Sequence, residues 1–370
     1  MKAPLHMERI ARLRERLRET GVDCIWIVQP ENRRYLSGFR AIDLQLIESS
    51  GSLLITDHDT LLLTDSRYTE EATREAVGFS VKTVQNGIVK GIAGLVPDLG
   101  TRRLGFEKDW VTWGMHRDLE KELRELSPPV ELVPLDGIVE EMREVKDADE
   151  RGALQASADL LSNIMGRIIE FLEPGLTERA VAWKVEEFAR EGGAEDLAFP
   201  SIVASGPNSA LPHAVPTERM LEQGEPVILD LGVKLNGYCS DMTRTVFLGN
   251  PSPTLKTIYR TVREAQAAAI REIRPGLETT FVDAIARDMI KQAGFGGYFG
   301  HGLGHGVGLA THEAPRLGPR KPTVLKQGMV VTVEPGIYVP GEGGVRLEEM
   351  VFLTAQGAEI MTSDSHFYDW

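Results

Sequence analysis

Several features are scarce or absent in this chain, and each narrows the class of protein. Only two cysteines, Cys24 and Cys239, occur in 370 residues, so no disulfide framework is expected and a reducing compartment fits. No uncharged apolar run approaches the roughly 20 residues that a membrane helix needs. Residues 1–19 contain no apolar signal-peptide core. We therefore expect a soluble, cytoplasmic protein with no membrane partner.

Basic residues are outnumbered as well. The chain has 41 Lys and Arg residues against 55 Asp and Glu, a formal net charge of −14. Because a nucleic-acid-binding protein normally shows a basic patch, no nucleic-acid partner is expected. The length allows two domains, each with its own core.

Helix and strand patterns alternate over about the first 135 residues, which predicts an α/β domain. We expect helices over residues 7–20, 66–77 and 113–126, a turn at Pro30-Glu31-Asn32, and strands over residues 24–28, 52–56, 60–64, 79–84, 103–106 and 130–133. The expected domains are residues 1–139 and 152–370, joined by the start of a helix at 140–151. No group of polar residues in the first domain has the spacing of a catalytic site.

The stretch 226–248 carries a first pair of carboxylates, Asp230 and Asp241. Between them lies Asn236-Gly237, the strongest short signal for a β-hairpin. A two-residue loop pairs Leu235 with Tyr238 and places Asp230 opposite Thr243. The two carboxylates then point to the same face of the hairpin.

Two acids on one face of an apolar hairpin are costly unless a positive charge lies between them. In one interpretation an acid pairs with Arg244 and the other is solvated. We favour a metal site instead, because Val, Ile, Leu and Phe residues flank both acids.

The second domain contains a weak internal repeat. Three segments recur in the same order, at offsets of 101, 99 and 104 residues: Pro174-Gly175-Leu176 with Pro275-Gly276-Leu277, His213–Pro216 with His312–Pro315, and Gln223–Asp230 with Gln327–Glu334. Three such matches predict two related halves, each built as helix, helix, strand and hairpin.

The repeat adds further candidates to the site. The predicted strand over residues 329–339, which carries Glu334, has a predicted partner over residues 343–353, which carries Glu348 and Glu349. Their side chains face opposite ways, and spacing favours Glu348 as the residue in the site. Residues 300–309, GHGLGHGVGL, supply a histidine, and the alternating glycines let this backbone pass close to a neighbour.

Two Asp, two Glu and one His form a ligand set for a pair of divalent ions about 3.5–4 Å apart, which would lower the pKa of a shared water to about 7. Carboxylates with one imidazole favour Mn, with Co or Zn as alternatives. His213 and His312, placed alike in the two halves, are candidates to stabilise an oxyanion.

The segments ILDLGVKLNGYCSDMTRT, HGLGHGVGLATHE, VEPGIY and GVRLEEMV resemble the metallopeptidase family that includes methionine aminopeptidase, aminopeptidase P and prolidase. The resemblance implies a duplicated "pita-bread" fold over roughly residues 150–360. Residues 32–38 and 65–68 resemble the creatinase/prolidase-like N-terminal α/β domain. Because methionine aminopeptidases lack that domain, the proline-specific branch is favoured.

The resemblance also assigns roles to individual residues. The implied metal ligands are Asp230, Asp241, His305, Glu334 and Glu348, and the implied catalytic residues are His213, His312 and Glu334, the last in proton transfer. Arg316 matches an arginine that holds the free carboxylate of a dipeptide in prolidases, although it could also be a surface arginine beside Arg320 and Lys321. Arg346 is expected to orient the metal ligands without contacting the metal itself. His301 lines either the proline pocket or only the loop.

These assignments predict a two-metal Xaa-Pro dipeptidase acting on proline-containing peptides. The alternatives are an Xaa-Pro aminopeptidase or a proline-directed carboxypeptidase on longer peptides. Some relatives of the same fold lack metal, such as creatine hydrolases and non-catalytic binding domains, but no expected ligand is missing here. A homodimer is expected from the family alone.

Overall fold

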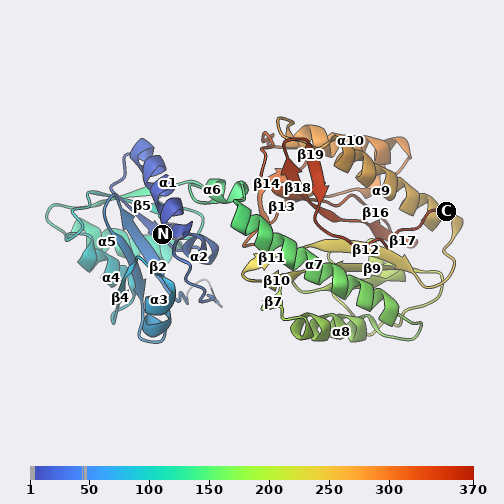
Figure 1. Ribbon diagram of the computed structural model, residues 1–370, viewed down its shortest axis with the longest axis horizontal. Helices are drawn as coiled ribbons and strands as arrows, with labels where there is room; N and C mark the ends of the chain where they lie inside the picture. The colour runs from blue at the N-terminus through green and yellow to red at the C-terminus, as the bar shows by residue number, and fades with distance from the viewer. Residues whose placement is uncertain (1–4, 44, 46–47) are drawn as a thin grey trace. The chain divides into compact units, whose positions relative to one another are not determined.

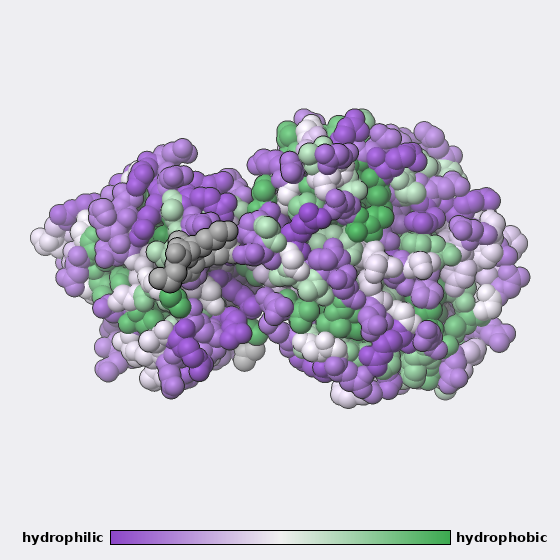
Figure 2. Space-filling view, in the orientation of Figure 1, coloured by the Kyte–Doolittle hydropathy of each residue, from purple (hydrophilic) through white to green (hydrophobic). Residues whose placement is uncertain are grey.

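The computed structural model describes residues 5–43, 45 and 48–370, so the first four residues of the stretch inspected for a signal peptide lie outside it. The chain divides into two compact units, Met1–Arg143 and Glu144–Trp370 (Figure 1). No helix among the described residues is both long and apolar enough to cross a membrane. The face shown in Figure 2 is largely hydrophilic, with apolar residues in small groups.

The first unit is an α/β domain around a six-stranded sheet with the strand order β4-β3-β2-β1-β5-β6. Its elements are α1 (Leu5–Thr20), β1 (Cys24–Ile27), α2 (Pro30–Ser37), β2 (Ser52–Thr56), β3 (Thr60–Thr64), α3 (Thr69–Glu75), β4 (Ser80–Thr83), α4 (Ile88–Leu95), β5 (Arg103–Glu107), α5 (Trp113–Arg124), β6 (Glu131–Leu135) and α6 (Glu140–Glu144). The six predicted strands are confirmed, and β2 and β3 form the expected hairpin.

Two parts of the first unit differ from the prediction. The turn expected at Pro30-Glu31-Asn32 is wrong, because Pro30 begins helix α2. Proline suits the first helical position, where its missing N–H costs no hydrogen bond. Helix α4 was not predicted, since Gly91 and Gly94 weaken its helical pattern.

The second unit consists of helix pairs packed on antiparallel sheets. Its elements are α7 (Ala148–Phe171), α8 (Glu178–Glu191), β7 (Asp196–Leu197), β8 (Ile202–Ser205), η1 (Gly206–Ala210), β9 (Pro226–Leu231), β10 (Val233–Leu235), β11 (Tyr238–Cys239), β12 (Met242–Phe247), α9 (Pro253–Glu272), α10 (Thr279–Gln292), η2 (Gly296–Tyr298), β13 (Gly304–Gly306), β14 (Glu313–Leu317), β15 (Val330–Val333), β16 (Gly336–Val339), β17 (Gly343–Arg346), β18 (Glu349–Thr354) and β19 (Gly357–Ile360).

The duplication predicted from the sequence is confirmed by matching backbone hydrogen bonds. The amide of Gly175, after α7, donates to the carbonyl of Leu221 at 3.0 Å, and that of Gly276, after α9, donates to Leu325 at 2.8 Å. The two donors are 101 residues apart and the two acceptors 104. The strand orders β12-β9-β8 and β18-β15-β13 also correspond.

The first hairpin has the predicted register. Leu235 pairs with Tyr238, and Asp230 pairs with Thr243. Asn236 and Gly237 have φ of 51° and 83°, as a two-residue turn that matches the twist of the strands requires.

The second hairpin keeps one register on both sides of a break. Val330 pairs with Phe352 in β15–β18, and Gly336 pairs with Arg346 in β16–β17. The same register places Glu334 opposite Glu348 at the break between these strand pairs. Pro335, which has no N–H to donate, follows Glu334.

Alternation along each strand separates an apolar face from a polar one. Val227, Leu229 and Leu231 of β9 share a core with helices α7 and α8, so Asp230 points away from these helices. In β15, Val331 and Val333 likewise pack with α9 and α10. The helix pairs therefore leave the opposite face of each half free for carboxylates.

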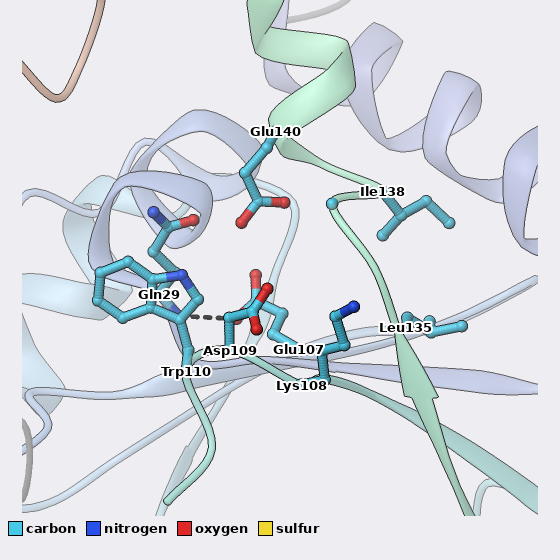
Figure 3. Close-up of a pocket in the computed structure, with 9 residues that line it drawn as sticks. Gln29, Glu107, Lys108, Asp109, Trp110, Leu135, Ile138 and Glu140 are labelled. Atoms are coloured by element: carbon cyan, nitrogen blue, oxygen red, sulfur yellow. Dashed lines mark hydrogen bonds between the residues drawn. The ribbon is translucent and has the colours of Figure 1, made fainter. Parts of the chain in front are cut away.

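The first unit contains a cavity of about 190 Å³ at the ends of β5 and β6 (Figure 3). Buried Glu107 lines it and accepts hydrogen bonds from the amides of Val28 and Gln29 and from Asn32 Nδ2. Burial, with a smaller contribution from Glu140, raises the pKa of Glu107 to about 7. All the lining residues belong to the first unit.

Glu107 should make the first unit less stable as the pH rises. The pKa of Glu107 in the folded state, about 7, exceeds the ordinary value of about 4.3. Between these two pH values the folded state binds a proton that the unfolded state has lost. The free energy of unfolding therefore falls by on the order of 3 kcal/mol as the pH rises to about 7. We expect Glu107→Gln to gain melting temperature relative to wild type between pH 5 and pH 8. Asp109→Asn, at an exposed position of the same cavity, should keep the wild-type pH dependence; a parallel shift in both variants would contradict the assignment.

Candidate metal centre

Four carboxylates converge on the face turned away from the helices. Asp230 lies on β9, Asp241 directly before β12, Glu334 between β15 and β16, and Glu348 between β17 and β18. Asp230, Asp241 and Glu348 are buried, with 9%, 4% and 2% of their surface exposed. Each half of the unit thus supplies two carboxylates from one hairpin.

His305, on β13, lies against this carboxylate cluster. Its Nε2 atom is 3.7 Å from Asp241 Oδ2 and 3.5 Å from Glu334 Oε1. Its Nδ1 atom is 3.0 Å from the carbonyl oxygen of Gly306, so Nδ1 carries the proton and Nε2 presents a lone pair. Burial, with a smaller contribution from His312, lowers the pKa of His305 to about 4. The ring is therefore neutral at neutral pH, as a metal ligand must be.

The backbone of β13 reaches this position only because glycines flank His305. A Cβ atom on Gly304 would lie 2.1 Å from the carbonyl oxygen of Thr332, and one on Gly306 would lie 2.2 Å from that of Ala314. The alternating glycines thus allow the close backbone approach expected from the sequence.

Burial and mutual repulsion both raise the pKa values of carboxyl groups in this cluster. Burial raises the pKa of Asp241 and Glu334 well above their usual range, and the neighbouring carboxylates raise them further. Burial followed by repulsion from Asp230 raises the pKa of Glu348 to about 8. In the absence of a cation, these groups cannot all be ionised at neutral pH.

A buried guanidinium, that of Arg346, lies beside this cluster and pairs with Asp230. Its Nη2 atom donates to Asp230 Oδ2 at 2.5 Å, its Nε to Thr243 Oγ1 at 3.2 Å, and its Nη1 to the carbonyl of Pro212 at 3.2 Å. Thr243 Oγ1 donates in turn to Glu348 Oε2 at 2.8 Å. Arg346 therefore orients Asp230 and Thr243, and it also holds the chain directly before His213.

Glu348 and Glu349 point to opposite faces of their strand. Glu348 belongs to the cluster, whereas Glu349 pairs with Arg244 at 2.8 Å. Arg244 also pairs with Asp364. The interpretation in which Arg244 neutralises Asp230 or Asp241 is therefore not what the structure shows.

The other predicted residues surround this cluster at more exposed positions. The ring of His312 lies 4.3 Å from that of His305, centroid to centroid. Burial lowers the pKa of His312, and Arg316 and His213 lower it further. Arg316 is exposed on β14, directly opposite His305 in the register. His213 is exposed in the loop after η1.

Sequence analysis missed Tyr338. Its hydroxyl accepts from Arg346 Nη1 at 2.7 Å and lies 2.9 Å from His301 Nε2. Tyr338 thereby links His301 to the guanidinium that holds Asp230. Its position four residues after Glu334, on the same face of the strand, was the available signal.

The residues present fit a divalent cation. Asp241, His305 and Glu348 each offer one ligand atom, and these three atoms lie within 4.8 Å of one another. Asp230 Oδ1 is buried and has no hydrogen-bond partner in the described part of the chain. When all four carboxyl groups are ionised, their charge exceeds that of Arg346 by three, and bound cations would compensate this excess.

Comparison with known proteins extends these findings. The model of the metallopeptidase family M24 matches residues 152–355, and that of the creatinase/prolidase N-terminal domain matches residues 9–145. The Xaa-Pro dipeptidase of Pyrococcus furiosus is 36% identical over 360 residues, which cover 96% of this chain and 97% of that protein.

Two solved structures are similar over nearly the whole chain. An Xaa-Pro dipeptidase from Bacillus anthracis has a TM-score of 0.91 and 40% identity, covering 97% of this chain and 98% of its own. An X-Pro aminopeptidase from Thermotoga maritima has a TM-score of 0.85 and 34% identity, covering 97% and 99%. The two-part architecture expected from the sequence, an α/β domain followed by a duplicated domain, is thereby confirmed.

Replacing Asp241 with Asn should change stability in opposite directions with and without metal. In EDTA the variant should melt higher than wild type, because a buried carboxylate no longer repels its neighbours or has to take up a proton. Each 1 kcal/mol added to the free energy of unfolding raises the melting temperature by roughly 2–4 °C. In Mn²⁺ the stabilisation that the ion confers on wild type should be largely lost.

Thermal melts at neutral pH in EDTA and in Mn²⁺ measure both effects. Asp288→Asn, on the exposed surface of α10, is the matched control and should behave as wild type. Equal stabilisation of Asp241→Asn and wild type by Mn²⁺ would argue against a metal centre.

Proposed function

Because this chain belongs to the metallopeptidase family M24, we propose that it is a two-metal Xaa-Pro dipeptidase that hydrolyses the peptide bond before proline. The observation that carries the proposal is the carboxylate cluster with His305 at its edge and the exposed guanidinium of Arg316 opposite His305. The names of the similar dipeptidases support the same substrate class.

Five residues would hold the ions: Asp230, Asp241, His305, Glu334 and Glu348. Their oxygen-rich set with one imidazole favours Mn²⁺, with Co²⁺ or Zn²⁺ as alternatives. When bound, two divalent ions supply Lewis acidity and a water of lowered pKa. Replacement of the ligand residues should therefore abolish turnover.

Glu334 is the residue proposed to move the proton. Its carboxyl group is only partly buried, and Thr332 Oγ1 donates to its Oε1 atom at 3.4 Å. As a carboxylate it would accept a proton from the attacking water and return it to the proline nitrogen as the peptide bond breaks.

His213 and His312 would stabilise the charge that develops on the carbonyl oxygen. The lowered pKa of His312 keeps its ring neutral with one N–H to donate. The hydrogen bond from Arg346 to the carbonyl of Pro212 fixes the chain directly before His213. His301, fixed by Tyr338, is the proposed wall of the proline site.

Arg316 is proposed to bind the free carboxylate of the dipeptide. A planar guanidinium matches a carboxylate through two parallel hydrogen bonds. The second candidate is an Xaa-Pro aminopeptidase, which the similarity to the Thermotoga maritima structure keeps open. We further propose a cytoplasmic homodimer, on the basis of the cysteine content and the family.

Product analysis by mass spectrometry separates the candidate activities. With Mn²⁺ present, an Xaa-Pro dipeptide should yield free proline, whereas the matching Xaa-Pro-Yaa tripeptide should be cleaved poorly. Release of the first residue from the tripeptide would instead identify an aminopeptidase, and release of the last a carboxypeptidase. No cleavage of either peptide by the metal-loaded protein would refute the substrate class.

The role of Arg316 can be tested with a substrate that lacks the carboxylate. Arg316→Ala should raise KM for the dipeptide about 10–100-fold, since a charged hydrogen-bonded pair contributes about 1.5–3 kcal/mol. It should barely affect the dipeptide amide, Xaa-Pro-NH₂. Arg320→Ala removes an exposed arginine from the same region and should leave both substrates unaffected; an equal loss on both substrates in Arg316→Ala would refute the carboxylate role.

A further inference from the structure

The C-terminal segment, Ser363–Trp370, has no helix or strand, yet it is anchored to several elements of the second unit. The amide of Ser363 donates to Ser162 Oγ on α7 at 3.0 Å. The amide of Tyr368 donates to the hydroxyl of Tyr259 on α9 at 3.3 Å. The segment therefore contacts one helix from each half.

Aromatic packing holds the far end of this segment. Tyr368 and Trp370 stack with their ring centroids 4.7 Å apart, and both make edge contacts with Phe247 and Tyr259. The hydroxyl of Tyr368 also accepts from the amide of Phe247, the last residue of β12, at 3.0 Å. Strand β12 thus ends against the segment.

The near end of the segment carries Asp364, which binds the buried Arg244. Arg244 Nε donates to Asp364 Oδ2 at 2.8 Å, and Arg244 Nη2 donates to the Asp364 carbonyl at 2.9 Å. Both side chains are almost completely buried, at 0% and 3% exposure. The ring of Phe367 covers the guanidinium, 4.5 Å from its centre.

From Arg244 the contacts continue directly to the carboxylate cluster. Arg244 Nη1 donates to the carbonyl of Glu348 at 2.8 Å and to that of Thr243 at 3.0 Å. The amide of Glu348 donates back to the Thr243 carbonyl at 3.1 Å. Arg244 therefore fixes the main chain at a proposed ligand, from the face opposite to the site.

The charges explain why Asp364 matters to this arrangement. Arg244 has two carboxylate partners, Glu349 and Asp364, and Thr362 Oγ1 donates to Glu349 in turn. A buried cation that loses one partner must turn toward the other or admit water. Either movement would displace the guanidinium that binds the Glu348 carbonyl.

We propose that the C-terminal segment is a structural part of the metal centre, with Asp364 as a positioning residue that acts on Glu348 through Arg244. The inference rests on the proposed function, because it takes Glu348 to be a metal ligand. Its consequence is that a residue which touches neither metal nor substrate sets the affinity for the metal.

The experiment is a titration of metal-free full-length protein with Mn²⁺ alone, followed by the electron paramagnetic resonance signal of free Mn²⁺ and by calorimetry. Asp364→Ala should weaken Mn²⁺ binding about tenfold, the size of effect typical of residues that hold a ligand in place. At saturating Mn²⁺, kcat should recover toward wild type while KM for the dipeptide stays unchanged. A general folding defect would lower kcat at every Mn²⁺ concentration.

Matched variants make the outcome decisive. Asp369→Ala removes an exposed carboxylate from the same segment and should bind Mn²⁺ as wild type does. If Asp364→Ala does not fold, the isosteric Asp364→Asn decides, with weaker Mn²⁺ binding than Asp369→Ala expected. Wild-type Mn²⁺ affinity in a folded Asp364 variant would overturn this inference alone. A wild-type protein that binds none of Mn²⁺, Co²⁺ and Zn²⁺ would overturn the proposed function and this inference with it.

Discussion

Repulsion among four converging carboxylates is the constraint on which the second unit depends. Asp230, Asp241, Glu334 and Glu348 lie together, Arg346 pairs with Asp230, and the neighbouring His305 is neutral at neutral pH. Such a cluster is unfavourable for the protein alone and becomes favourable when cations fill it. The surrounding helices, the close-packed glycines beside His305 and the buried arginines all serve to hold acids where they would otherwise separate.

The duplicated fold meets this constraint by using the two faces of each strand differently. The side chains of Thr243 and Glu348 face the cluster, whereas the next residues, Arg244 and Glu349, face the helices and the C-terminal segment. Two ionic networks therefore lie on opposite faces of the same strands. One is the carboxylate cluster with Arg346. The other, formed by Arg244, Glu349 and Asp364, is buried and internally paired, and it restrains the backbone of the strands that carry the cluster.

The fold was largely predictable where the signals were local. Asn236-Gly237 determined the turn, and the turn determined the pairing of Asp230 with Thr243. The repeated Pro-Gly-Leu turns indicated the two halves, because each follows a long helical pattern at nearly the same offset. The prediction was wrong at α2, because a proline such as Pro30 is also typical of a turn. It missed α4, because two glycines lower the helix propensity of a segment that tertiary packing stabilises.

The sequence by itself placed the candidate acids on matching faces, through strand alternation and the repeat, whereas the choice of His305 rested on the family resemblance. Only the tertiary structure decided what surrounds them: that Arg346 binds Asp230, that Tyr338 joins His301 to Arg346, and that Asp364 reaches Arg244. These contacts join residues up to 120 positions apart. Periodicity shows which way a side chain points, but only the packing of the two halves decides which distant groups it meets.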